Sequence, residues 1–199
     1  MKILFLTNNP NTEHLIDWLK IAAKEEVIVW GEGINYEDLK TISPDYIISY
    51  NYKYIIKKEV LDFLPDRVIN LHISFLPYNR GSNPNIWSFL EDTPKGVTIH
   101  LVDEGLDTGD ILVQKEIYFD EGLESLKSSY DKLHNEIQNL FKEYWSRIKA
   151  GDIEPIKQSG DGSTNTKKDF LQIEPLLKEK GWDSPIREIK KHYLQRTVK

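Results

Sequence analysis

The sequence has no cysteine among its 199 residues. Disulfides, thiolate metal sites and cysteine nucleophiles are therefore excluded together. No apolar run approaches the roughly 18 residues that a membrane-spanning helix needs. The apolar start over residues 2–6 stops at Thr7, which is too early for a secretory signal peptide. These absences lead us to expect a cytoplasmic protein with no membrane partner.

An excess of positive charge is also absent, because 26 Lys and Arg face 32 Asp and Glu, for a net charge of −6. Proteins that bind nucleic acid usually carry a basic face, so we expect no nucleic-acid partner. The length suits one α/β domain with a short appendage. A break at the Ser-Gly-Asp-Gly-Ser run starting at Ser159 divides a predicted catalytic domain (residues 1–158) from a C-terminal extension (159–199). The extension is a candidate for pairing subunits into a homodimer.

Several common catalytic motifs are missing. The sequence contains no phosphate-binding G-x-x-x-x-G-K-[ST] loop, no H-E-x-x-H helix and no G-x-S-x-G elbow. The turn after the first predicted strand reads Thr-Asn-Asn-Pro at residues 7–10 and lacks the glycines of a dinucleotide fingerprint. An NAD-dependent enzyme is therefore disfavoured.

Short apolar runs alternate with amphipathic stretches, which is typical of βαβ units and a parallel sheet. Strands are predicted over residues 2–6, 26–30, 46–50, 67–71, 96–102 and 111–119. Helices are predicted over residues 12–24 (with Thr12 as N-cap), 36–41, part of 53–63, 85–90 and 123–149. The expected fold is α/β and Rossmann-like, with a mostly parallel twisted sheet flanked by helices.

Polar residues gather where the fourth and fifth predicted strands end. Asn70 and His72 are two residues apart, so they share one side of an extended chain. His100 lies within the fifth strand, and Asp107 lies in the loop after it. Open parallel sheets bind ligands at the carboxyl ends of their strands. An amide, an imidazole and a carboxylate there suit acyl transfer without a covalent intermediate.

Simpler interpretations exist for the same residues. Asp107 lies in a glycine-rich loop, where aspartate is a common turn residue. His72 and His100 could be buried structural groups. A metal site built from His72, His100 and Asp107 lacks any characteristic spacing, so we expect no metal.

Two motifs carry a family resemblance. Residues 70–77 read NLHISFLP and are followed by Gly81, which resembles the N-x-H-x-S-x-L-P…G signature of formyltransferases that use N10-formyltetrahydrofolate. Residues 97–109 read VTIHLVDEGLDTG and resemble the second motif of the same family. The resemblance implies a formyltransferase fold, a formyl-folate co-substrate and no metal.

The resemblance also implies roles for individual residues. Asn70, His72 and Asp107 would be catalytic, with Asn70 and His72 stabilising the tetrahedral oxyanion and Asp107 sustaining the histidine charge. The residues that would bind the folate are Tyr54, Ile55, Ile56, His100 and Asp103.

Further stretches resemble the N-formyltransferases of nucleotide-linked amino sugars, namely residues 76–89, 92–98 and 167–170. That branch implies a substrate such as dTDP-4-amino-4,6-dideoxyglucose and a place in surface-polysaccharide (lipopolysaccharide O-antigen) synthesis. Tyr78 and Trp87 could stack on a sugar or base, Arg80 could meet a pyrophosphate, and Gly81 would line the site. Helix-to-sheet packing is the alternative role for Trp87.

Other activities of the same family stay open. A formyltetrahydrofolate hydrolase would release formate without an acceptor. Glycinamide ribonucleotide formyltransferase is disfavoured by the missing phosphate loop, and methionyl-tRNA formyltransferase by the short extension and the acidic charge. A non-catalytic folate- or nucleotide-binding regulator would not need the intact trio.

Overall fold

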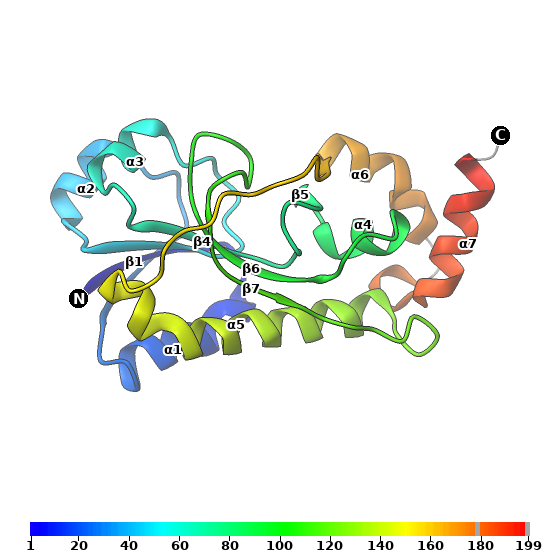
Figure 1. The fold of residues 1–199 in the computed structure, drawn as a ribbon, viewed down its shortest axis with the longest axis horizontal. Helices are drawn as coiled ribbons and strands as arrows, with labels where there is room; N and C mark the ends of the chain where they lie inside the picture. Colours follow the sequence, from blue (N-terminus) through cyan, green and yellow to red (C-terminus); the bar gives the residue numbers. More distant parts are fainter. Residues whose placement is uncertain (178–179, 198–199) are drawn as a thin grey trace.

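The computed structural model describes residues 1–177 and 180–197, and its centre is a six-stranded sheet (Figure 1). The strand order is β2-β1-β3-β4-β6-β7. The bounds are β1 (Lys2–Leu6), β2 (Glu26–Trp30), β3 (Tyr46–Ser49), β4 (Val68–His72), β6 (Gly96–Leu101) and β7 (Ile111–Glu116). The first four strands are parallel, whereas β6 and β7 run antiparallel to their neighbours. The predicted mostly parallel α/β sheet is confirmed.

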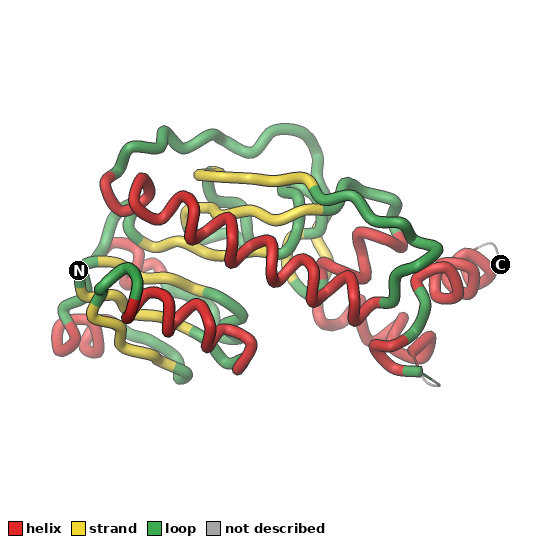
Figure 2. The backbone as a smooth tube through the Cα atoms, turned by 90° about the horizontal axis from the view of Figure 1, so that it is seen from below, coloured by secondary structure: helices red, strands yellow, loops and turns green. Residues whose placement is uncertain are grey.

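Helices cover both faces of this sheet. Helices α1 (Glu13–Ile21) and α5 (Leu126–Ala150) pack on one face, and α5 runs along its length (Figure 2). Helices α2 (Tyr36–Ile42) and α3 (Lys58–Phe63) pack on the other face. Side chains alternate between the faces of a strand. On the face opposite α5, the residues of β4 and β6 that α2 and α3 do not cover can therefore be polar.

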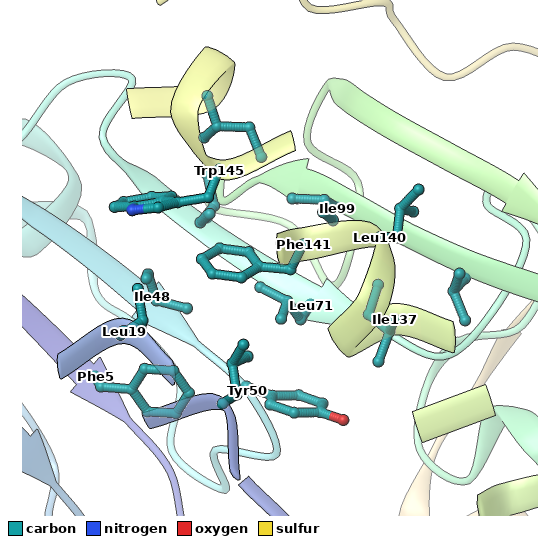
Figure 3. Close-up of a cluster of buried hydrophobic side chains, with 14 of the residues drawn as sticks. Phe5, Leu19, Ile48, Tyr50, Leu71, Ile99, Ile137, Leu140, Phe141 and Trp145 are labelled. Carbon is teal, nitrogen blue, oxygen red and sulfur yellow. The ribbon is translucent and has the colours of Figure 1, made fainter. Parts of the chain in front are cut away.

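A hydrophobic core lies between the sheet and α5. Leu71 and Ile99 of the sheet meet Phe141 and Trp145 of α5 (Figure 3). Ser125 caps the helix start by accepting a hydrogen bond from the Ser128 N–H. A serine at this position provides a partner for a backbone N–H of the first turn, which has none within the helix. The helix therefore begins at Leu126, three residues after the predicted start at residue 123.

Thr12 is the N-cap residue of α1, as predicted, but its side chain makes no capping hydrogen bond. Residues 10–12 form a 3₁₀ turn before the helix. The Thr12 hydroxyl instead donates to the Asn9 carbonyl at 2.8 Å. Asn9 supplies the capping oxygen, which accepts from the Asn11 N–H at 3.1 Å.

The C-terminal extension packs against the rest of the molecule. Strand β8 (Thr164–Asn165) pairs in parallel with β5 (Arg80–Gly81). Helices α6 (Lys167–Ile173) and α7 (Ile186–Thr197) and the 3₁₀ turn at 174–177 bury a second hydrophobic cluster with α4 (Pro84–Leu90). A further 3₁₀ turn spans residues 181–183. None of the helices in the described residues is both long and apolar enough to cross a bilayer.

Candidate active site

The antiparallel pairing of β4 with β6 brings four polar side chains to one patch of the sheet. Asn70 pairs with His100 and His72 pairs with Thr98. These four residues point away from α5, because their neighbours Leu71 and Ile99 fill the core on that side. The sequence pattern predicted that Asn70 and His72 share a side. The cross-strand register adds His100.

Asp107 completes this group from the loop between β6 and β7. Its Oδ1 accepts from Asn70 Nδ2 at 3.2 Å and lies 3.5 Å from His100 Nε2. Its Oδ2 accepts from the Gly81 N–H at 2.8 Å and lies 3.7 Å from His72 Nδ1. One carboxylate therefore contacts the amide, both imidazoles and a backbone donor.

The surroundings of Asp107 keep it ionised. Burial is the largest single influence and would raise the pKa of this carboxyl. The His72 charge, the His100 hydrogen bond and charge, and the Gly81 N–H together outweigh burial and hold the Asp107 pKa well below its usual range. A negative charge is thus fixed beside Asn70 and the two histidines.

Two glycines allow the loop to place Asp107. A Cβ on Gly109 would lie 1.8 Å from the Leu101 carbonyl oxygen, and one on Gly105 would lie 1.9 Å from Thr108 Oγ1. Asp107 itself adopts a left-handed conformation with φ 54°. Aspartate is among the few residues that tolerate this region. Asp107 is therefore both a turn residue of the glycine-rich loop and a residue of the site.

His72 is fixed from its other nitrogen by a residue that sequence reasoning missed. The Asn79 carbonyl lies 3.1 Å from His72 Nε2. The Asn79 side chain is fully buried, donating to Glu91 Oε2 at 3.1 Å and accepting from Thr93 Oγ1 at 2.7 Å. The same Glu91 accepts from Asn165 of the extension at 3.1 Å. The only sequence signal here was the long ordered loop over residues 72–84.

A cavity of 740 Å³ opens over this group. Its volume lies in the range of about 300–1,000 Å³ typical of small-molecule sites. All of the residues predicted to be catalytic or to bind folate line it: Asn70, His72, Asp107, Tyr54, Ile55, Ile56, His100 and Asp103.

Of the four residues predicted to contact the sugar nucleotide, only Gly81 lines this cavity. Trp87 is 5% exposed and packs in the cluster between α4 and the extension, so the packing alternative describes it. The Arg80 guanidinium donates to Gln158 Oε1 from Nε at 3.0 Å and from Nη2 at 2.8 Å. Tyr78 is half-buried and also lies off the cavity wall.

The wall includes three further residues that sequence reasoning did not select, Tyr130 of α5 and Lys167 and Trp182 of the extension. These three positions are far apart in the sequence, and only the tertiary structure brings them to the cavity that Asn70 and His72 also line. Within residues 1–177 and 180–197, no group of three or more His, Asp or Glu side chains is arranged to hold a metal ion.

The sequence is similar to those of several known proteins. The chain is 34% identical over 138 residues to the dTDP-4-amino-4,6-dideoxyglucose formyltransferase of Mycobacterium bovis, covering 69% of this chain and 58% of that protein. It is 32% identical over 158 residues to the methionyl-tRNA formyltransferase of Caldanaerobacter subterraneus, covering 77% of this chain and 48% of that protein. The chain spans about half the length of these curated relatives.

A solved structure matches over nearly the whole chain. The formyltransferase PseJ from Anoxybacillus kamchatkensis, in complex with UDP-4,6-dideoxy-4-formamido-L-AltNAc and tetrahydrofolate, is 42% identical. The TM-score is 0.87, and the match covers 95% of this chain and 97% of that chain. The formyl transferase family model matches residues 32–144, which include Asn70, His72 and Asp107. The predicted family is thereby confirmed, and this chain belongs to the formyl transferase family.

Proposed function

We propose that this protein transfers a formyl group from N10-formyltetrahydrofolate to the amine of a nucleotide-linked 4-amino-4,6-dideoxy sugar. The observation that carries this proposal is the contact of Asn70, His72 and His100 with the ionised Asp107 on the floor of one cavity. Support for the acceptor comes from two similar proteins, the UDP-sugar complex of PseJ and the dTDP-sugar enzyme of Mycobacterium bovis.

The proposed reaction needs an oxyanion site and a route for one proton. The neutral sugar amine attacks the formyl carbon, and the carbonyl oxygen becomes an oxyanion. Asn70 Nδ2 contacts both Asp107 Oδ1, at 3.2 Å, and His100 Nε2, at 3.3 Å, so it donates to this oxyanion by giving up the His100 contact. His72 donates beside it from Nδ1, because its Nε2 already donates to the Asn79 carbonyl, and the Asp107 carboxylate stabilises the positive charge of the ring. The bond from carbon to folate N10 then breaks, and the proton lost by the amine passes to N10.

We place the folate between two loops of the cavity wall. Residues 54–56 follow β3, and Asp103 follows β6. Ile55 is 86% exposed at this wall, so an apolar surface is available to a bound aromatic ring. Because folate and sugar nucleotide are both soluble intracellular metabolites, we also propose that the protein works in the cytoplasm. The domain boundary after residue 158 and the homodimer stay predictions.

A formyl-transfer assay tests the proposal directly. The purified protein is incubated with N10-formyltetrahydrofolate and a panel of UDP- and dTDP-linked 4-amino-4,6-dideoxy sugars, with glycinamide ribonucleotide alongside. We expect a formamido sugar from at least one nucleotide sugar, and the extent of the PseJ match favours the UDP series. Turnover of glycinamide ribonucleotide alone would overturn the proposal. Formate release that no sugar acceptor accelerates would assign a hydrolase instead.

A further inference from the structure

We infer that Gln158 is a positioning residue of the formyl-transfer site, which holds the catalytic Asp107 in place and is itself oriented by Arg80. Gln158 lies in the segment that joins α5 to β8, and Figure 1 shows this segment passing beside the β6–β7 loop. Neither Gln158 nor Arg80 lines the cavity, so both act through Asp107 rather than on a substrate. The inference rests on the proposed function only in taking Asp107 as a catalytic group.

Asp107 needs support from outside its own loop. Its backbone has a φ of 54°, a left-handed conformation that is unfavourable for an L-amino acid. Its neighbours Leu106 and Thr108 are exposed, so little packing holds the chain there. A residue in such a conformation persists only where several contacts fix it. The contacts made by Asp107 therefore decide where its carboxylate lies.

The side-chain amide of Gln158 binds the backbone on both sides of Thr108. Its Nε2 donates to the Asp107 carbonyl at 2.8 Å and to the Gly109 carbonyl at 2.8 Å. Its Oε1 accepts from Arg80 Nε at 3.0 Å and from Arg80 Nη2 at 2.8 Å. Both amide protons and both oxygen lone pairs are thus used. These partners also fix the orientation of the amide, because a flipped amide would turn its N–H groups toward the guanidinium and its oxygen toward the carbonyls.

The chemistry of both partners selects glutamine at this position. A lysine could donate to the two carbonyls, but it would be repelled by the Arg80 guanidinium. A glutamate could accept from Arg80, but its oxygens would face two carbonyl oxygens. Of the long polar side chains, only glutamine carries two N–H donors and an acceptor at its end. Gln158 therefore connects a cation to two acceptors, which neither charged side chain could do.

Strand β5 holds Asp107 at two points. The Gly81 N–H donates to Asp107 Oδ2 at 2.8 Å, and Arg80 is the residue before Gly81. The strand therefore fixes the Asp107 carboxylate directly and the Asp107 carbonyl through Gln158. β5 is itself fixed, because it pairs with β8 and the Arg80 N–H donates to the Ser163 carbonyl at 2.9 Å. The backbone and the carboxylate of Asp107 thus share one support.

The alternative role for Arg80 is the pyrophosphate contact that the sequence predicted. Two of its guanidinium nitrogens already donate to Gln158, and the side chain lies off the cavity wall. The two roles differ in their kinetic effect. Loss of a substrate contact raises KM, whereas displacement of a catalytic group lowers kcat.

Steady-state kinetics of Gln158→Leu and Gln158→Glu tests the inference. Leucine removes every hydrogen bond of the amide, whereas glutamate can keep the Arg80 contact and loses both donors to the loop. We expect kcat to fall at least about tenfold in each variant, because a small displacement of a catalytic group has effects of this size. Each KM should change less than about twofold, and Arg80→Met should show the same pattern with a smaller loss. Gln172→Leu is the matched control, since Gln172 is exposed on α6 and does not line the cavity.

A double-mutant cycle with Asp107→Asn separates positioning from a general effect on the fold. In the Asp107→Asn background, Gln158→Leu should lower the single-turnover rate less than about twofold, because the group that it positions is already lost. An equal loss in both backgrounds would overturn the inference, and so would a wild-type kcat in Gln158→Glu. A raised KM for the nucleotide sugar with an unchanged kcat in Arg80→Met would assign Arg80 to the substrate and overturn its part in the inference.

The same assays distinguish this inference from the proposed function. If the wild type formylates a nucleotide sugar and Gln158→Leu keeps its kcat, the inference fails while the proposed function stands. If the wild type releases formate from N10-formyltetrahydrofolate but formylates no sugar, the proposed function fails. The variants are then assayed on formate release, where a tenfold loss still supports the inference and an unchanged rate overturns it. If the wild type turns over no formyl-folate at all, both fail.

Discussion

His72 and Asn79 are joined by a 3.1 Å contact between the imidazole Nε2 and a backbone carbonyl. A carbonyl can only accept, so Nε2 must carry a proton and donate it. Nδ1 is then the nitrogen that faces Asp107, at 3.7 Å from its Oδ2. The ring orientation is therefore set by a residue seven positions away in the chain, and the histidine is ready to act before any substrate arrives.

Replacing this histidine tests its assigned role. We expect His72→Asn to lower kcat by about 10²–10³, the loss typical when one oxyanion donor is removed. The shorter amide cannot reach both Asn79 and the reacting carbonyl. Folate affinity should change little, because residues 54–56 are untouched. Rapid-quench turnover and folate titration measure the two effects, and an unchanged kcat would refute the catalytic role.

The buried support of Asn79 gives a second prediction. Glu91 accepts one hydrogen bond from Asn79 and one from Asn165, through its two oxygens. Glu91→Gln keeps the shape but turns an amide N–H₂ toward one of these donors, which should cost about 1–3 kcal/mol of folding stability. Because the Asn79 carbonyl orients His72, we also expect kcat to fall while the folate KM stays unchanged.

A neighbouring carboxylate provides the control for this change. Asp92 is exposed and pairs with Lys190 at the surface, so Asp92→Asn should leave kcat unchanged. Thermal unfolding is measured alongside the kinetics. A lower Tm with an unaltered kcat in Glu91→Gln would show that Glu91 supports the fold without positioning His72.

The sequence predicted contacts between residues that are close in the chain and missed contacts between residues that are far apart in it. Asn70 and His72 were placed together by the period of a strand, which is a local property. The Glu91 contact with Asn165 joins residues 74 positions apart, and no spacing rule links them. Trp87 was ambiguous because an aromatic residue on a short helix suits both packing and binding. The C-terminal extension packs on α4 and buries Trp87, so this residue has a packing role.

The loop that carries Asp107 should not tolerate a side chain at Gly109. A Cβ there would lie 1.8 Å from the Leu101 carbonyl oxygen, so Gly109→Ala must move the loop or the end of β6. We expect Asp107 to be displaced and turnover to fall by about 10² or more. Gly31→Ala is the control, since its nearest contacts are 3.5 and 3.6 Å. Wild-type turnover in Gly109→Ala would show that the loop can shift without moving the carboxylate.

The buried His134 should make the fold sensitive to acid. It is 4% exposed, contacts Tyr50 Oη through Nδ1, and has no partner for Nε2. Burial lowers the pKa of His134 from 6.5 to about 4, against a smaller opposing effect of Asp131. Between these values the unfolded chain binds a proton that the folded protein does not. Stability should therefore fall as the pH drops, by roughly 2 kcal/mol from pH 7 to pH 5.

Urea unfolding of the wild type and of His134→Gln at several pH values measures this dependence. Glutamine cannot titrate, and its amide oxygen can still accept from Tyr50, so the variant should lose less stability between pH 7 and pH 5. His14→Gln removes an exposed histidine of α1 and should keep the wild-type dependence. The free energies of unfolding of the wild type and both variants are compared at each pH. The contribution of the carboxylates is the same in all three proteins and cancels in the differences. Parallel stability curves for the wild type and His134→Gln would contradict a neutral, buried His134.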